Sequence, residues 1–153
     1  AKYLNAAIAA EQSPETVAEY QLELATMYYK AGRIVKAVEA AKDCAAKDRS
    51  GRFSGKAYFL IANIWAANKC QGNEIETRAN FWVAVDYLEK AMAADPSLAE
   101  DAKKSIAQYR TYFPFVADVF MFTKPDGEPY KDGDTFEISG NGLKAVTTVR
   151  TQK

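Results

Sequence analysis

The sequence predicts a mainly α-helical fold in which antiparallel helix pairs stack into an α-α superhelix that ends in a small β-hairpin. Apolar residues recur at spacings of three and four through residues 2–113, the periodicity of helices buried on one face. Glycine and proline interrupt this pattern at short intervals, so we expect consecutive helices to be antiparallel neighbours. After residue 134, polar and apolar residues alternate around a Gly-Asn-Gly turn, which is typical of a hairpin.

The first helix pair is bounded by clear start and stop signals. Residues 2–11 place their apolar side chains on one helical face. The Ser-Pro-Glu segment at residues 13–15 supplies an N-cap, a proline at the first helical position and an acid in the first turn. The helix that follows ends at Gly32, which suits a left-handed C-cap, and a second helix runs over residues 33–46.

A second helix pair follows a polar, glycine-bearing link at residues 47–55. A third helix is expected from Ala57 to beyond Trp65. The sequence from Asn73 to Glu76 resembles a capping box, so we expect a fourth helix to begin there and to run to about residue 94, before an Asp-Pro stop.

A fifth helix is predicted over residues 98–113, where a proline stops it. Residues 134–150 are predicted to form the hairpin. An isolated two-stranded hairpin is marginal in water, so we expect it to lie on the last helices. The apolar side chains that we expect to anchor it are Phe120, Phe122, Phe136 and Ile138.

Composition restricts the classes of function. The 153 residues carry 48% hydrophobic and 26% charged residues, as in an ordinary folded domain. Twenty basic and twenty acidic residues give a net charge of zero and are spread evenly, so there is no basic stripe to bind nucleic acid or an anionic membrane. No apolar run approaches the ~20 residues of a transmembrane segment. The absence of histidine excludes histidine-based catalysis and histidine-containing zinc sites.

The cysteines and carboxylates give no sign of a metal site, a cofactor or an active site. Cys44 and Cys70 are predicted near opposite ends of the third helix, about 20 Å apart. A disulfide requires Cα atoms within about 7 Å, so we expect none between them. Pairs of acids, such as Glu19 with Glu23, fall on solvated helix faces. We therefore expect a protein that is not an enzyme.

Both helix pairs resemble the tetratricopeptide repeat, a helix–turn–helix unit of about 34 residues. The residues that carry the resemblance are Leu24, Ala25, Tyr28, Gly32, Ala37 and Ala45 in the first pair, and Ala84, Leu88, Ala91, Asp95 and Pro96 in the second. Tyr28 and Trp65 are 37 residues apart, close to one repeat, whereas Trp65 and Tyr109 are 44 apart. The spacing places an insertion at about residues 70–79, interpreted as extra turns of the fourth helix or, alternatively, as a ledge beside the groove.

The resemblance implies a domain organisation like the C-terminal part of a bacterial tetratricopeptide protein with a short β-rich tail. Such a fragment would belong to a longer protein of the bacterial cytoplasm or envelope, and its sequence leaves the compartment and the oligomeric state open. The array is expected over residues 1–115, and its parts are the end of a preceding repeat at 1–12, repeats at 14–48 and 55–96, a capping helix at 98–113 and a tail at 116–153 packed on the array.

The resemblance also implies a non-enzymatic scaffold that binds a protein partner, as a peptide or helix, on the concave face of the array. Transfer by repeat position assigns this face to Leu22, Thr26, Tyr29, Lys30, Phe59, Asn63, Lys103 and Arg110. The plainer interpretation is an ordinary exposed face with one or two half-buried aromatic residues. An alternative function is a structural C-terminal cap of a longer array whose binding repeats lie upstream.

Overall fold

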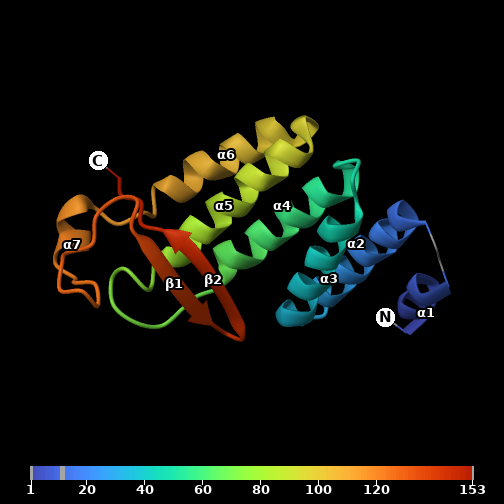
Figure 1. The fold of residues 1–153 in the computed structure, drawn as a ribbon, viewed down its shortest axis with the longest axis horizontal. Helices are drawn as coiled ribbons and strands as arrows, with labels where there is room; N and C mark the ends of the chain where they lie inside the picture. The colour runs from blue at the N-terminus through green and yellow to red at the C-terminus, as the bar shows by residue number, and fades with distance from the viewer. Residues whose placement is uncertain (1, 11–12, 153) are drawn as a thin grey trace.

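The structure is a computed structural model that describes residues 2–10 and 13–152 (Figure 1). The described chain is mainly helical, with a two-stranded antiparallel sheet at its C-terminal end. In chain order the elements are α1 (Lys2–Ala10), α2 (Pro14–Lys30), α3 (Ile34–Lys47), α4 (Arg52–Ala67), α5 (Ala79–Ala94), the 3-10 helix η1 (Pro96–Leu98), α6 (Ala99–Arg110), α7 (Val116–Phe120), β1 (Thr135–Gly140) and β2 (Leu143–Thr148).

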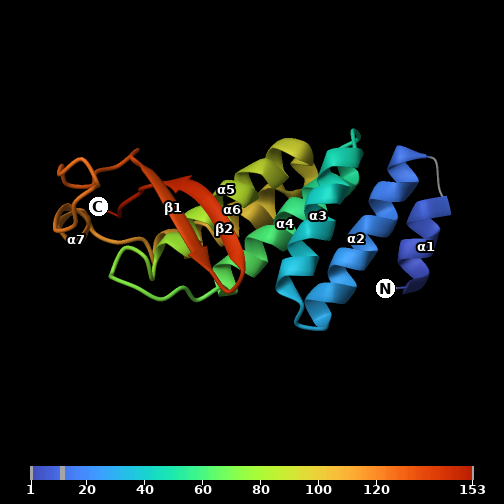
Figure 2. The same cartoon turned by 60° about the horizontal axis from the view of Figure 1, so that its bottom comes forward.

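The helices α1 to α6 lie in a row in which each long helix packs against the next along the chain. In addition, α2 contacts α4 across α3. Helix α1 and the hairpin lie toward opposite ends of this row in both views (Figures 1 and 2). This serial packing agrees with the short links predicted between the helices. The predicted fifth helix, residues 98–113, corresponds to α6, which follows η1 directly and ends at Arg110, three residues earlier than expected.

Small residues occupy the sites where the helices approach one another. Four alanines of the repeat pattern have no exposed surface, namely Ala25, Ala37, Ala84 and Ala91, and Ala62 of α4 is buried to the same degree. Trp65 is 1% exposed, and Tyr28 and Tyr109 are half-buried against the core. These small and aromatic side chains therefore lie between the helices rather than on the surface.

The turn between α2 and α3 is built by Gly32, which has a φ of +79°. Its N–H donates to the carbonyl of Tyr29 at 3.0 Å, and the N–H of Arg33 donates to the carbonyl of Tyr28 at 2.9 Å. These two bonds form a Schellman motif, which satisfies the last carbonyls of α2 and reverses the chain within a few residues.

The corner between α3 and α4 depends on Asp48, which is 7% exposed. Its carboxylate accepts hydrogen bonds from the N–H groups of Phe53 and Ser54, at 2.7 and 2.8 Å, and from Ser50. Asp48 therefore caps α4, which begins at Arg52 inside the segment predicted to be a link. Burial opposes ionisation of this carboxyl, but the hydrogen bonds outweigh it and lower its pKa to about 2.

The prediction that α5 begins at Asn73 is wrong. The capping box itself is present, because the Asn73 side chain accepts from the N–H of Glu76 at 2.9 Å and the Glu76 carboxylate accepts from the N–H of Asn73 at 3.1 Å. It caps a single turn, and α5 starts only at Ala79. The break turns Ile75 into the core, where it is 1% exposed, and lets the Asn80 amide donate to the last carbonyls of α4.

The insertion at residues 70–79 is therefore not a helical extension of α5. It forms a loop whose first residues lie beside the turn of the hairpin (Figure 2). The amide of Asn68 donates to the carbonyl of Gly140 at 3.3 Å, and the amide of Asn141 donates back to Asn68 at 2.7 Å. The thiol of Cys70 lies directly against Gly140. The loop supports the hairpin turn.

Three of the four expected anchors of the tail are confirmed. Phe136 and Ile138 are buried and Phe122 is half-buried against the core, but Phe120 is 64% exposed. The reason is local: residues 116–120 form the short helix α7 rather than an extended run. On a helix, adjacent side chains point about 100° apart, so Val119 faces inward while its neighbour Phe120 faces outward.

The hairpin lies on α5, as the weakness of an isolated hairpin requires. The ring of Phe136 meets the ring of Trp82 edge-on, with 5.6 Å between the ring centroids. The indole N–H of Trp82 donates to the carbonyl of Arg150 at 2.8 Å. The guanidinium of Arg150 in turn binds the Asp86 carboxylate, which also accepts from the Thr147 hydroxyl.

The two cysteines, Cys44 and Cys70, are free and buried, as the predicted helix order requires. Burial, with a smaller contribution from the charge of Asp48, raises the pKa of the Cys44 thiol to about 12. Burial also raises the pKa of Cys70. Both thiols are therefore protonated at neutral pH and poorly suited to nucleophilic chemistry.

We expect the replacement Ala37→Leu to lower the free energy of unfolding by about 1–3 kcal/mol, because the added methylene and methyl groups have no room between helices. Ala46→Leu is the matched control, since Ala46 is exposed on the same helix. It should change the value by less than about 0.5 kcal/mol. Urea denaturation measures both. Equal effects of the two replacements would show that Ala37 does not limit the approach of the helices.

We expect Asp48→Asn to lower the free energy of unfolding by about 2 kcal/mol at pH 7, because the folded state holds the pKa below its ordinary value of 3.8. The unfolded chain binds this proton first as the pH falls. The advantage of the wild type should therefore be complete above about pH 5 and should shrink between about pH 4 and pH 2. Asp43→Asn, at an exposed position of α3, is the control. If the wild type and Asp48→Asn differed in their free energy of unfolding by the same amount at every pH in this range, the lowered pKa of Asp48 would be contradicted.

Candidate functional site

The eight residues predicted for the binding face lie on three helices. Leu22, Thr26, Tyr29 and Lys30 are on α2, Phe59 and Asn63 on α4, and Lys103 and Arg110 on α6. Five of these side chains are exposed, namely Tyr29, Lys30, Asn63, Lys103 and Arg110, and the other three are half-buried. The exposed residues are the ones available to a partner.

The half-buried members have structural contacts. Leu22 packs against the main core. The Thr26 hydroxyl donates to the carbonyl of Leu22 at 3.0 Å, within its own helix. Phe59 packs against a small cluster that contains Leu88 and Ala102, which joins α4 to α5 and α6. These contacts stabilise the stack, so a replacement of Phe59 would affect folding as well as binding.

Three rings form a group, here called the aromatic cluster: Phe81, Tyr109 and Tyr112. Phe81 of α5 stacks on Tyr112 with 4.7 Å between ring centroids, and it lies 5.7 Å from Tyr109. Burial, followed by the nearby hydroxyls of Tyr112 and Tyr29, raises the pKa of Tyr109. These ring contacts join α5 to the C-terminal end of α6 and the residues that follow it.

The predicted binding face carries both exposed rings and exposed cations. Tyr29 is 41% exposed and Tyr112 is 42% exposed. Within the described ranges, no acidic side chain lies within 4 Å of Lys30, Lys103 or Arg110. The sequence reasoning missed Phe81 and Tyr112. The spacing of three between Tyr109 and Tyr112 was a usable signal, whereas the contact with Phe81 depends on how α5 meets α6.

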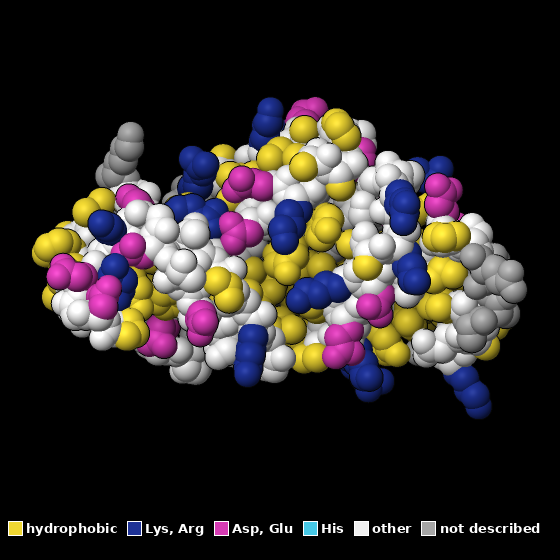
Figure 3. Space-filling model, viewed as in Figure 1, with side chains coloured by type: hydrophobic (Ala, Val, Ile, Leu, Met, Phe, Trp, Pro, Cys, Tyr) yellow, Lys and Arg dark blue, Asp and Glu magenta, His cyan; other side chains and the backbone are white. Residues whose placement is uncertain are grey.

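A large hollow lies elsewhere, between α3, α5 and the hairpin, with a volume of about 1130 Å³. We call it the hairpin groove. Figure 3 shows a hydrophobic hollow near the centre of this face, with lysine and acidic side chains around it. The apolar side chains that line the groove are Val83, Tyr87, Ala93, Ile138, Ala145 and Val146. None of the eight predicted residues lines it.

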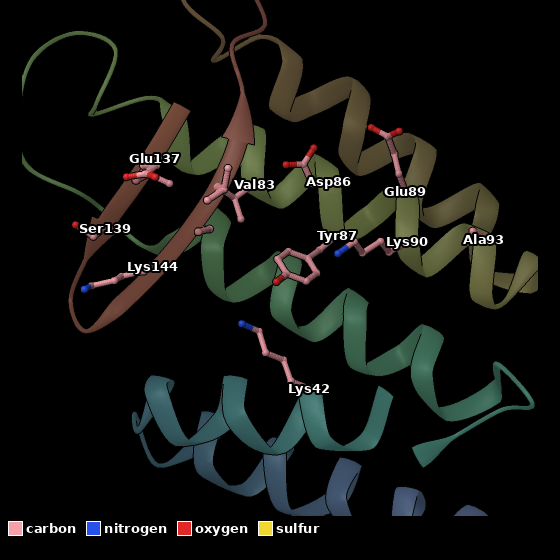
Figure 4. A pocket seen from close by; sticks show the side chains of 13 residues that line it. Lys42, Val83, Asp86, Tyr87, Glu89, Lys90, Ala93, Glu137, Ser139 and Lys144 are labelled. Carbon is pink, nitrogen blue, oxygen red and sulfur yellow. The ribbon is translucent and has the colours of Figure 1, made fainter. Parts of the chain in front are cut away.

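Lysine and tyrosine side chains meet in the hairpin groove (Figure 4). The ammonium of Lys90 lies 4.9 Å from the ring centroid of Tyr87 and 5.9 Å from that of Tyr58. Lys42, from α3, extends toward the same tyrosine from the opposite side. Burial, then the neighbouring Tyr58 and Asp86, raises the pKa of Tyr87, so its hydroxyl stays protonated. Sequence reasoning missed this site because the hairpin forms one of its walls.

The described residues include no group of three or more cysteine or acidic side chains placed to hold a metal ion. Within residues 2–10 and 13–152, every helix is too short or too polar to cross a membrane. In comparisons with known proteins, no family model, no curated protein and no solved structure matches this chain.

Proposed function

We propose that the chain is a non-enzymatic protein–protein interaction scaffold of the tetratricopeptide type, which binds a peptide or helix on the face formed by α2, α4 and α6. The serial packing of the helices supports this proposal, because repeat arrays bury the apolar face of each pair against its neighbours. The fully buried alanines at repeat positions, such as Ala37 and Ala84, support it as well.

The aromatic cluster is the observation that carries the proposal. Exposed tyrosines held in place by neighbouring rings lose little entropy on binding, and tyrosine is enriched among the residues that dominate binding energy. Tyr112 meets both conditions, since it is 42% exposed and stacks on Phe81, and Tyr29 of α2 offers a second ring that is 41% exposed. The unpaired cations Lys30, Lys103 and Arg110 favour a partner with acidic groups beside an apolar anchor.

A structural cap is the alternative, and the position of the hairpin favours it. Residues 135–152 cover Trp82, which is fully buried, and tie the C-terminal segment to α5 through Arg150. A terminal unit that seals the last apolar face is what a repeat array requires at its end. On this alternative, the binding surface of the full protein belongs to repeats that precede this segment.

We expect Tyr29→Ala to reduce the capture of a partner protein at least about tenfold, since a central aromatic anchor contributes more than about 1.4 kcal/mol. Immobilised wild-type and variant proteins would be compared by quantitative mass spectrometry of material bound from the native lysate. Affinities for the captured partner would then be measured by calorimetry. The position is exposed, so unfolding should change by less than about 0.5 kcal/mol.

Tyr3→Ala is the matched control, because Tyr3 is 82% exposed on α1 and lies outside the aromatic cluster. Its variant should retain the partner. Equal capture by the wild type and Tyr29→Ala would exclude the proposed face. The absence of any partner with all three proteins would favour the cap.

A further inference from the structure

The outer edge of β2 carries backbone groups that the hairpin does not use. Gly140 pairs with Leu143 across a two-residue loop, which makes them a hydrogen-bonded pair. Alternation along the ladder then makes Lys144 and Val146 members of non-hydrogen-bonded pairs, opposite Ser139 and Glu137. The N–H and C=O groups of Lys144 and Val146 therefore point away from β1.

This edge borders the hairpin groove, so that an added strand would have a surface to cover. Lys144, Ala145 and Val146 all line the groove, and α5 supplies Val83 and Tyr87 on its other side. Val146 is 66% exposed, so its apolar side chain is open to solvent beside the free edge. An extended segment here would bury this side chain and pair with its backbone at the same time.

The free length of the edge is short. At one end Thr147 is hydrogen-bonded to Asp86 of α5. At the other end the hairpin turn lies against α3, since a Cβ added to Gly142 would come within 2.8 Å of a methyl carbon of Val35. The interval between these contacts accommodates about four residues of extended chain, or roughly 13 Å.

The charged side chains around the groove indicate which charge a bound segment would carry. Its acids Asp86 and Glu89 face the guanidinium of Arg150, and Asp86 also accepts from Thr147. Among the described residues, Lys42 and Lys90 have no acidic group within 4 Å, and both ammonium groups lie near Tyr87 (Figure 4).

The remaining charged groups of the groove lie away from this point. Glu137 is on β1, the strand farther from Tyr87, and Lys144 extends away from that tyrosine. The unneutralised charge beside the apolar floor is therefore positive.

We propose that the hairpin groove binds a short, extended, acidic segment of a partner protein, which adds to the outer edge of β2 as a third strand. Its backbone pairs with Lys144 and Val146, an apolar side chain on one face of the added strand covers Val146, and a carboxylate on its other face lies between Lys42 and Lys90. This site is separate from the face of α2, α4 and α6, and either proposal stands without the other.

Fluorescence anisotropy with three labelled peptides of about seven residues tests the proposal. The first alternates valine and glutamate, the second replaces glutamate by lysine, and the third is the acidic peptide with its central backbone amides N-methylated. We expect the acidic peptide to bind with a Kd below about 1 mM and the other two at least about tenfold more weakly. Undetectable binding of the acidic peptide at about 1 mM, or equal binding of all three, would overturn the proposal.

Two proline variants locate the edge that is used. Val146→Pro removes an outward N–H from β2, and Glu137→Pro removes one from the opposite position of β1, so both leave the ladder between the strands intact. We expect only Val146→Pro to weaken the acidic peptide, by at least about tenfold. If only Glu137→Pro weakened the binding of the acidic peptide, the peptide would pair with the edge of β1, which would contradict the proposal. The N-methylated peptide tests backbone pairing itself without altering the protein.

Charge reversal tests the role of the lysines. The double variant Lys42→Glu, Lys90→Glu should weaken the acidic peptide at least about tenfold and improve the binding of the lysine peptide. The control is Lys103→Glu, which reverses a charge on α6, on the face of α2, α4 and α6. It should leave the affinities for the acidic peptide and for the lysine peptide unchanged. If Lys103→Glu weakened the binding of the acidic peptide and the double variant did not, the peptide would bind the face of α2, α4 and α6, which would contradict the proposal.

Discussion

The close approach of neighbouring helices at alanine is the constraint on which the rest of the structure depends. Ala37, Ala62 and Ala84 have no exposed surface, and the large side chain of Trp65 is buried in the same core cluster as Ala37 and Ala84. A larger residue at an alanine position would push two helices apart and open the core around the tryptophan. The row of helices, and therefore every surface built across two of them, follows from this packing.

The hairpin depends in turn on α5. Two strands alone would be marginally stable, and here Trp82, Asp86 and Arg150 connect them to a helix that is itself fixed in the row. The loop before α5 supports the turn from below through Asn68. This docking leaves one edge of the hairpin facing a hollow and supplies both walls of the hairpin groove, so the groove exists only in the assembled fold.

The two candidate surfaces differ in chemistry. The aromatic cluster offers tyrosine rings with cations elsewhere on the same face, which suits a partner held by side-chain anchors. The hairpin groove offers backbone hydrogen-bonding groups with an apolar floor and two lysines, which suits a partner held by its main chain. No residue is shared between them, so a single chain has room for two segments of partner protein.

The sequence by itself determined the features that are local. Gly32 ends α2, an Asp-Pro pair ends α5, and Asn141-Gly142 closes the hairpin, because each of these acts through the conformation of its own few residues. The helical periodicity also identified the buried alanines and the interior Trp65.

Only the tertiary structure decided the start of α5 at Ala79, the exposure of Phe120 and the hairpin groove. These depend on contacts such as that of Asn80 with Trp65 and that of Arg150 with Asp86. The partners in such contacts are separated by 15 to 64 residues, and no periodicity or capping signal in the chain records which distant groups will meet.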